Sequence, residues 1–197
     1  RSFELLTKDC YIANIGDIMK EDWKIVPHTF KFRYGDDDEK GGCTFIGGSW
    51  EDVTTDDLFK GKKVVLFSLP GAFTPTCSSE QLPAYEEMFD KFKAVGVDEV
   101  YCVSVNDAFV MNAWARDLGI KKVKMIPDGC GTFTRNMGML VDKPAQGFGM
   151  RSWRYSALVE DGVVTKFNQE PGYNHFSADA DPYTNSDPQT LLATISH

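Results

Sequence analysis

Residues 63 to about 94 constrain the fold more than any other part of the chain. Residues 63–69 (KVVLFSL) form a nearly continuous apolar run of strand length, which is typical of a strand that is covered on both faces. A short loop follows, and the apolar spacing from Pro75 to about Ala94 then predicts a long helix. A buried strand that leads through a tight loop into a helix is the first half of a parallel β-α-β unit.

Further strands and helices are expected after this unit. Asn106 and Asp107 can cap a helix that ends at Gly119, and Asp187 with Pro188 can start a last helix. The remaining segments have the composition of strands, and they are residues 100–105, 123–126, 154–159 and 163–167. The last two predict a hairpin, because Asp161-Gly162 between them supplies its turn chemistry.

The order of these elements predicts the fold class. Parallel β-α-β units followed by an antiparallel hairpin and a helix predict an α/β, thioredoxin-like fold, with a central mixed sheet flanked by helices. Residues 26–34 alternate apolar and polar side chains as a half-buried strand does. We expect residues 1–50 to form an N-terminal extension or hairpin that packs on a domain of residues 51–197.

Composition excludes several classes of function. The chain has 197 residues, of which 42% are hydrophobic, and this suits one domain with an ordinary core. Its formal net charge of −8 disfavours a nucleic-acid binder, which needs a basic surface to neutralise phosphates, and it also disfavours binding to an anionic membrane. No run approaches the ~18 apolar residues of a transmembrane helix.

The cysteines and histidines predict neither a disulfide framework nor a metal site. The five cysteines are odd in number and widely spaced, and no Cys-x-x-Cys occurs. The three histidines lie far apart in the sequence, without the spacing of zinc ligands. A reducing intracellular compartment fits this pattern, either the cytoplasm or the matrix of a mitochondrion or plastid.

The loop between the first strand and the long helix carries the chemistry. If Thr74 is the N-cap, Pro75 takes the first helical position and Cys77 the third. The Thr74 hydroxyl can then accept a hydrogen bond from the Cys77 N–H, and the partial positive charge of the helix start favours a thiolate. Pro83 within the same helix predicts a kink. A single thiol at this place can attack an electrophile, hold the adduct and wait for a second thiol.

This segment resembles the active-site signature of peroxiredoxins, P-x-x-x-T-x-x-C, with Pro70, Thr74 and Cys77. The string PGAFTPTCS, together with SVNDAFV at 104–110 and RSWRYSALVEDG at 151–162, is similar to the type-5 subfamily. The resemblance is specific over residues 61–171. It implies a thiol-dependent peroxidase that reduces hydrogen peroxide and organic hydroperoxides through a cysteine sulfenic acid, in antioxidant defence and redox homeostasis.

The resemblance also implies a role for each matched residue. Cys77 matches the peroxidatic cysteine, Thr74 the threonine that binds peroxide, and Pro70 the proline that shields the thiolate from water. Arg154 matches the arginine that pairs with the thiolate and the peroxide, and its neighbour Arg151 points elsewhere if Arg154 lies in a strand. The backbone N–H groups near Thr76 and Cys77 are further donors for the substrate. No cofactor or metal is expected.

The source of the second thiol separates the subtypes of this family. Two-cysteine members of the type-5 subfamily carry a resolving cysteine near the C-terminus, but the matching residues 170–177 (EPGYNHFS) contain none. We therefore expect a one-cysteine enzyme that is reduced by an external thiol, namely glutathione, glutaredoxin or thioredoxin. Cys130, Cys43 or Cys10 as an unorthodox resolving residue is the alternative. The resemblance also suggests a homodimer that packs near the active-site loops.

Two other functions compete with this prediction. A cysteine hydrolase or transferase would pair Cys77 with His28 or His175, but no signature of an oxyanion hole accompanies those residues. A redox sensor or chaperone would use a slowly oxidised cysteine that a partner protein reads. A peroxide reaction no faster than that of a free thiol would favour the second of these.

Overall fold

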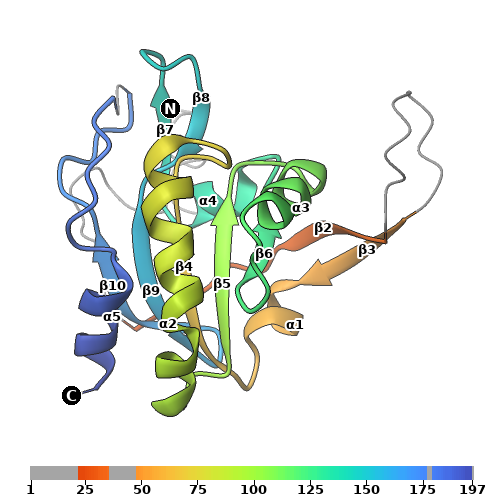
Figure 1. Cartoon of the computed structure of the whole chain (residues 1–197), viewed down its shortest axis with the longest axis vertical. Helices are drawn as coiled ribbons and strands as arrows, with labels where there is room; N and C mark the ends of the chain where they lie inside the picture. The colour runs from red at the N-terminus through yellow and green to blue at the C-terminus, as the bar shows by residue number, and fades with distance from the viewer. Residues whose placement is uncertain (1–21, 36–47, 177–178, 197) are drawn as a thin grey trace, which may run out of the picture.

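A six-stranded mixed sheet forms the centre of the molecule, in the order β1-β10-β9-β4-β5-β6 (Figure 1). The computed structural model describes residues 22–35, 48–176 and 179–196. The strands of the sheet are β1 (Trp23–Lys24), β4 (Lys63–Ser68), β5 (Glu99–Ser104), β6 (Lys124–Pro127), β9 (Tyr155–Glu160) and β10 (Val163–Gln169). Strands β4, β5 and β6 are parallel, whereas β9 runs antiparallel to β4 and β10. The predicted thioredoxin-like sheet is confirmed.

Helices cover both faces of the sheet (Figure 1). They are α1 (Thr55–Phe59), α2 (Leu82–Ala94), α3 (Ala108–Asp117), α4 (Thr132–Asn136) and α5 (Pro188–Ile195). Val65 and Phe67 of β4 pack in one apolar cluster with side chains of α2, α3 and α5. Val64 and Leu66 belong to the other cluster, with side chains of α1 and α4. Burial on both faces explains why β4 is apolar at almost every position.

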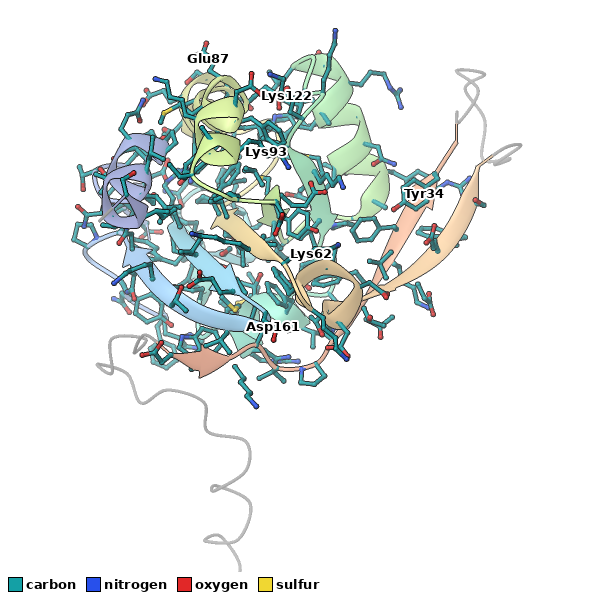
Figure 2. The ribbon with its side chains drawn as sticks, turned by 90° about the horizontal axis from the view of Figure 1, so that it is seen from below. Tyr34, Lys62, Glu87, Lys93, Lys122 and Asp161 are labelled. Atoms are coloured by element: carbon teal, nitrogen blue, oxygen red, sulfur yellow. The ribbon has the colours of Figure 1, made fainter. Side chains whose placement is uncertain are left out.

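Two ribbons stand beside the central sheet. One pairs β2 (Thr29–Tyr34) with β3 (Ser49–Thr54), and the other pairs β7 (Leu140–Lys143) with β8 (Gly149–Ser152). The boundary expected at residue 50, between an N-terminal extension and the domain, falls within β3. Phe30 of β2 is buried in the same core cluster as side chains of the central sheet. Tyr34 lies where the first ribbon projects from the body of the molecule (Figure 2). The sequence did not predict α4, β7 or β8.

Local capping and turn chemistry fix several predicted boundaries. Asp107 caps α3 by accepting from the Val110 N–H at 2.9 Å, and Asp187 caps α5 by accepting from the Thr190 N–H at 2.8 Å. The turn between β9 and β10 uses left-handed φ angles of 50° at Asp161 and 77° at Gly162. The Asp161 N–H donates to the Lys62 carbonyl at 2.9 Å, and both residues lie at the end of the sheet where β4 begins (Figure 2). The predicted reactive loop lies beyond the other end of β4.

Candidate active site

Cys77 lies in the first turn of the helix that follows β4, and its side chain is only 1% exposed. The helix begins at Pro75, and its first backbone hydrogen bond runs from the Ser78 N–H to the Thr74 carbonyl at 3.0 Å. The N–H groups of Thr76 and Cys77 precede this ladder, so they are among the donors that a helix leaves without an intrahelical partner. Cys77 is therefore a buried thiol at the positive end of a helix.

The helix widens directly after the cysteine. Cys77 to Gln81 form a π-helical turn, η1 (Cys77–Gln81), in which the Leu82 N–H donates to the Cys77 carbonyl five residues earlier. Pro83, which has no N–H to donate, follows at the start of α2. The kink predicted at Pro83 stays a prediction, and the irregularity that the structure shows is the wide turn that precedes it.

The Thr74 hydroxyl makes a different hydrogen bond from the one predicted. It donates to the Gly71 carbonyl at 2.7 Å, whereas the sequence predicted that it accepts from the Cys77 N–H. Gly71 lies only three residues before Thr74, so the hydroxyl finds an acceptor within the loop itself. Pro70 is buried in the same loop, and Thr74 and Thr76 are half-buried.

Arg154 supplies a cation beside the sulfur. It lies in the two-residue link between β8 and β9, directly before β9, whereas the prediction made it the first residue of that strand, and it is 1% exposed. Its Nη1 lies 3.5 Å from the Cys77 Sγ across 77 residues of sequence. The structure therefore brings together the two residues for which the family resemblance implied a pair.

Gln81 is a site residue that the sequence analysis missed. Its Oε1 accepts a hydrogen bond from Nη1 of Arg154, the nitrogen that also faces the sulfur. Its Nε2 donates to the Ser68 carbonyl at 3.4 Å, and the side chain is fully buried. The local signal for Gln81 is its place four residues after Cys77, which puts both on one side of the helix.

Residues 181–183 enclose the rest of the guanidinium. Nη2 of Arg154 donates to Asp181, Nε donates to the Pro182 carbonyl at 3.2 Å, and the Tyr183 ring lies 5.6 Å from Cζ. Desolvation works to lower the pKa of Arg154, but the neighbouring Cys77 and Asp181 charges outweigh it and hold that pKa above its ordinary value. Arg154 is therefore a permanent buried cation.

Arg151 lies near the site without a hydrogen bond to the sulfur. Its Nε donates to the Phe148 carbonyl at 3.1 Å, and its Nη1 donates to the Val105 carbonyl at 3.4 Å. The same Nη1 would lie 2.8 Å from a Cβ built on Gly71, so only glycine leaves room for it in the reactive loop. Arg151 therefore binds loop carbonyls, although the condition of the prediction, that Arg154 lies in a strand, is not met.

The other described cysteines differ in burial. Cys102 is fully buried in β5, and desolvation, with a contribution from the Cys77 charge, raises the pKa of its thiol well above the ordinary value. Cys130 is exposed in the loop after β6, and all three described cysteines are free. Cys10 and Cys43 lie outside the described residues.

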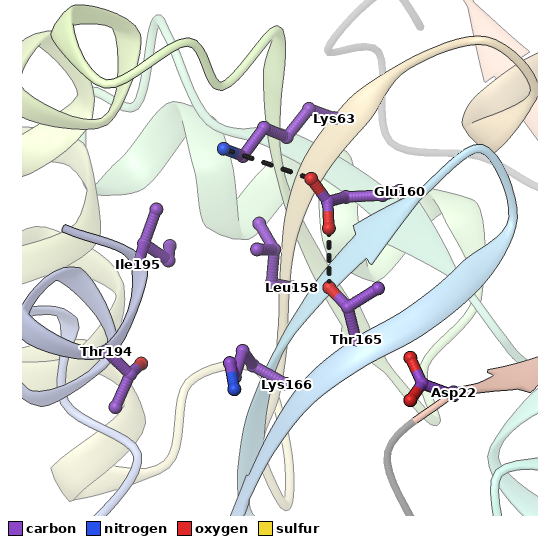
Figure 3. A pocket seen from close by; sticks show the side chains of 8 residues that line it. All are labelled: Asp22, Lys63, Leu158, Glu160, Thr165, Lys166, Thr194 and Ile195. Carbon is purple, nitrogen blue, oxygen red and sulfur yellow. Dashed lines mark hydrogen bonds and ion pairs between the residues drawn. The ribbon is translucent and has the colours of Figure 1, made fainter. Parts of the chain in front are cut away.

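One pocket of about 350 Å³ lies away from the thiol (Figure 3). Lys63 and Glu160 on its wall are an ion pair at 3.9 Å, and Glu160 also accepts from the Thr165 hydroxyl at 2.9 Å. Lys63 is the first residue of β4, whereas Cys77 follows the last, so this pocket is not the reactive site. Within residues 22–35, 48–176 and 179–196, no His, Cys, Asp and Glu side chains group into a metal site. None of the helices in those ranges has the length and apolarity of a bilayer crossing.

A thioredoxin-like fold with a thiol at a helix start and a buried cation beside it defines a thiol-based oxidoreductase. Residues 43–183 match the family model described as Redoxin. Peroxiredoxin y4vD of Sinorhizobium fredii is 60% identical over 154 residues, which cover 76% of this chain and 81% of that protein. The hybrid peroxiredoxin hyPrx5 of Haemophilus influenzae is 50% identical and is matched over 86% of this chain and 63% of its own length.

Solved structures agree with this similarity. The crystal structure of the Plasmodium falciparum antioxidant protein, a 1-Cys peroxiredoxin, matches with a TM-score of 0.77 at 36% identity, and the match covers 89% of this chain and 99% of that one. The chain belongs to the peroxiredoxin family. It is therefore a peroxidase, an oxidoreductase that reduces peroxide with thiols.

Proposed function

We propose that Cys77 is the peroxidatic residue of a one-cysteine, type-5 peroxiredoxin that reduces hydrogen peroxide and organic hydroperoxides. The observation that carries the proposal is the 3.5 Å approach of the Arg154 Nη1 to the Cys77 Sγ inside the protein. A buried thiol without such a partner is an inert packing residue, because burial disfavours the thiolate. A guanidinium at this distance favours the thiolate and keeps its charge at every pH of interest.

The first step is a displacement at oxygen. The Cys77 thiolate attacks the nearer peroxide oxygen, an S–O bond forms as the O–O bond breaks, and the sulfur becomes a sulfenic acid. The departing oxygen leaves as an alkoxide or hydroxide and takes a proton to give an alcohol or water. Negative charge therefore grows on that oxygen, where Arg154 and the N–H groups of Thr76 and Cys77 are the donors. Thr74 binds the peroxide through its hydroxyl, and Pro70 keeps water from the thiolate.

Thiolate formation alone accounts for a small part of the rate. A free thiol with a pKa of about 8.5 is a few per cent ionised at pH 7, so full ionisation gains roughly 30-fold. Nucleophilicity falls as the pKa falls, which reduces that gain. Stabilisation of the departing oxygen by fixed donors must supply most of the remaining rate acceleration over a free thiol. Removal of one such donor typically lowers the rate of an enzyme 10²–10³-fold.

The second half of the cycle uses an external thiol. A thiolate attacks the sulfenic sulfur and releases water, and a second thiol then displaces Cys77 from the mixed disulfide. Cys102 is an unsuitable partner because it is fully buried in β5, and Cys130 is the exposed alternative. The 1-Cys description of the Plasmodium falciparum relative supports this cycle. We place the enzyme in a reducing compartment, the cytoplasm or an organelle matrix, where such thiols are supplied.

Steady-state assays with each reductant test this proposal. Peroxide consumption is followed with glutathione alone, with glutathione and glutaredoxin, and with thioredoxin and its reductase. We expect sustained turnover with at least one external thiol, unchanged in Cys130→Ser and absent in Cys77→Ser. Turnover that is lost in Cys130→Ser would contradict the one-cysteine cycle. Equal activity of Cys77→Ser and the wild type would contradict the assignment of Cys77.

We also propose a homodimer that packs through the surface beside the reactive loop. Phe73 in that loop is 54% exposed and has a left-handed φ of 62°, a strained conformation for an aromatic residue. Trp50 of β3 is 57% exposed and stacks edge-on against Phe109 of α3 at 5.5 Å. A contact with a second copy would bury these rings. Analytical ultracentrifugation of the wild type and of Phe73→Asp tests this, with a monomeric wild type as the contradicting result.

A further inference from the structure

The C-terminal residues 179–186, here called the strap, contact Arg154 through three successive members. The Asp181 carboxylate accepts from Nη2, the Pro182 carbonyl accepts from Nε at 3.2 Å, and the Tyr183 ring lies 5.6 Å from Cζ. Every nitrogen of the guanidinium therefore has a partner, and Nη1 faces Gln81 and the Cys77 sulfur. The strap thus contacts the Nε and Nη2 atoms of Arg154, and Nη1 is the nitrogen that faces the Cys77 sulfur.

A buried lysine holds the strap before Asp181. Lys143 at the end of β7 is 1% exposed, and its Nζ donates to the Ala180 carbonyl at 2.9 Å. Its Nζ also lies 5.4 Å from the centre of the Trp153 ring. Its burial has an electrostatic cost, because desolvation lowers the pKa of Lys143. A buried ammonium requires fixed acceptors, so the strap backbone is held where it passes Lys143.

A buried carboxylate holds the strap after Tyr183. Glu170 is 1% exposed, and it accepts from the backbone N–H groups of Thr184, Asn185 and Ser186 at 2.8–3.0 Å. The hydroxyls of Thr184 and Ser186 add bonds at 3.0 and 2.8 Å. Burial works to raise the pKa of Glu170, but these hydrogen bonds outweigh it and hold the pKa below its ordinary value. Asp181 thus sits between two buried anchors.

We propose that Asp181 is a positioning residue for the reduction of peroxide by Cys77, acting through Arg154. The inference rests on the proposed role of Cys77. The Asp181 carboxylate fixes Nη2, so that Nη1 is aimed at the sulfur and at the peroxide oxygen that leaves from it. The negative charge of this carboxylate is separated from the Cys77 thiolate only by the Arg154 guanidinium, which contacts both groups. It therefore offsets part of the Arg154 charge that Cys77 experiences.

Two substitutions separate these two effects. Asp181→Asn keeps an oxygen that can accept from Nη2 but removes the charge, so the thiolate of Cys77 becomes easier to form. We expect the pH profile of Cys77 alkylation by iodoacetamide to move to lower pH, and only modestly, since Asp181 is half-exposed and partly screened. Asp181→Ala also removes the acceptor, and we expect it to lower the rate of Cys77 oxidation about tenfold as well.

Asp179→Asn and Asp179→Ala are the matched controls. Asp179 lies in the same strap and carries the same charge, but it accepts from the Ala145 N–H at 3.2 Å and from the Gln146 side chain at 2.8 Å, both in the β7–β8 turn. Alkylation is assigned to Cys77 by peptide mass spectrometry. Oxidation is followed by stopped flow with hydrogen peroxide, at a pH where the alkylation rates of the wild type and of the variant have both reached their plateau. A difference in the oxidation rate then reflects the position of Arg154 and not the ionisation of Cys77.

The outcomes are distinguishable. A lower-pH profile in both Asp181 variants, with the rate loss confined to Asp181→Ala, supports the proposal. Asp181 variants that match their Asp179 counterparts in both measurements would overturn it. A rate loss without any movement of the pH profile would also overturn it, because a merely structural contact gives that pattern. Slow oxidation of the wild type itself would instead contradict the proposed function of Cys77, and with it this inference.

Discussion

Cys77 and Cys102 are two buried thiols of the same apolar cluster, but their surroundings act in opposite directions on the formation of a thiolate. Cys102 in the middle of β5 has no cation among its described contacts, and burial raises the pKa of its thiol well above the ordinary value. Cys77 is buried to the same degree, but it meets the Arg154 Nη1 at 3.5 Å and lies at a helix start. Burial makes a thiol inert unless a buried cation accompanies it.

The largest expected difference lies between removal of one thiol and removal of the other. Cys77→Ser should lower the rate of reaction with hydrogen peroxide at least about a thousandfold, or ~4 kcal/mol of activation free energy, because only the free-thiol reaction remains. Cys102→Ala should keep the rate of the wild type. Stopped-flow kinetics with one equivalent of peroxide measures both. Comparable losses in the two variants would contradict the difference in reactivity between Cys77 and Cys102.

The cation should account for the next largest effect. Arg154→Lys should slow oxidation about 10²–10³-fold, because an ammonium cannot bind the sulfur, Gln81 and Asp181 together as the planar fork does. Arg151→Lys is the matched control, and its loss should be much smaller because Arg151 binds loop carbonyls. An equal or larger loss in Arg151→Lys would show that the wrong arginine has been paired with Cys77.

A smaller effect is expected at the loop threonine. Thr74→Val should lower the oxidation rate about tenfold, the cost of roughly one hydrogen bond to the bound peroxide. Thr74→Ser keeps the hydroxyl and should retain most of the rate. Single-turnover rates of both variants, taken at the same peroxide concentrations, give the result. Equally slow Val and Ser variants would contradict a role for the hydroxyl, because Ser keeps it and can still donate to the Gly71 carbonyl.

The smallest expected effect concerns stability at alkaline pH. The thiol of Cys102 stays protonated in the folded state to a higher pH than in the unfolded chain, where it ionises near pH 8.5. Above that pH the unfolded chain has lost a proton that the folded protein keeps, so the free energy of unfolding falls, by up to ~1.4 kcal/mol per pH unit from this group. Below about pH 8 the group contributes no slope.

Cys102→Ala removes this contribution and should flatten the decline. Urea denaturation at pH 8 and at pH 9.5 measures it, and the wild type should lose more stability between these values than the variant does. The buried Tyr85 and Tyr155 hydroxyls, whose pKa values are also raised by desolvation, affect both proteins alike. Equal slopes in the two proteins would mean that Cys102 is less strictly buried than described.

The sequence predicted the parts of the site that depend on local chemistry. The strand before Cys77, the helix after it and the caps at Asp107 and Asp187 follow from apolar spacing and from residues next to one another. The pairing of Arg154 with Cys77 came from family resemblance, because 77 residues separate the two in the sequence.

The sequence could not predict the polar shell around Arg154. Lys143, Glu170 and Asp181 are ordinary charged residues in their local context, and each gains its role only when distant elements meet. Their buried contacts reach residues 14 to 37 positions away. The short elements α4, β7 and β8 were missed for a related reason, since four or five residues carry too little periodicity to predict a helix or a strand.

We expect a charged partner, and not accessibility, to select the thiol that reacts with peroxide. The most direct measurement oxidises the reduced wild type with half an equivalent of hydrogen peroxide in the presence of dimedone, and maps the trapped sulfenic acid over all five cysteines. We expect the label to be confined to Cys77, which is 1% exposed, and the exposed Cys130 to stay unlabelled. A label found mainly on Cys130 would contradict it.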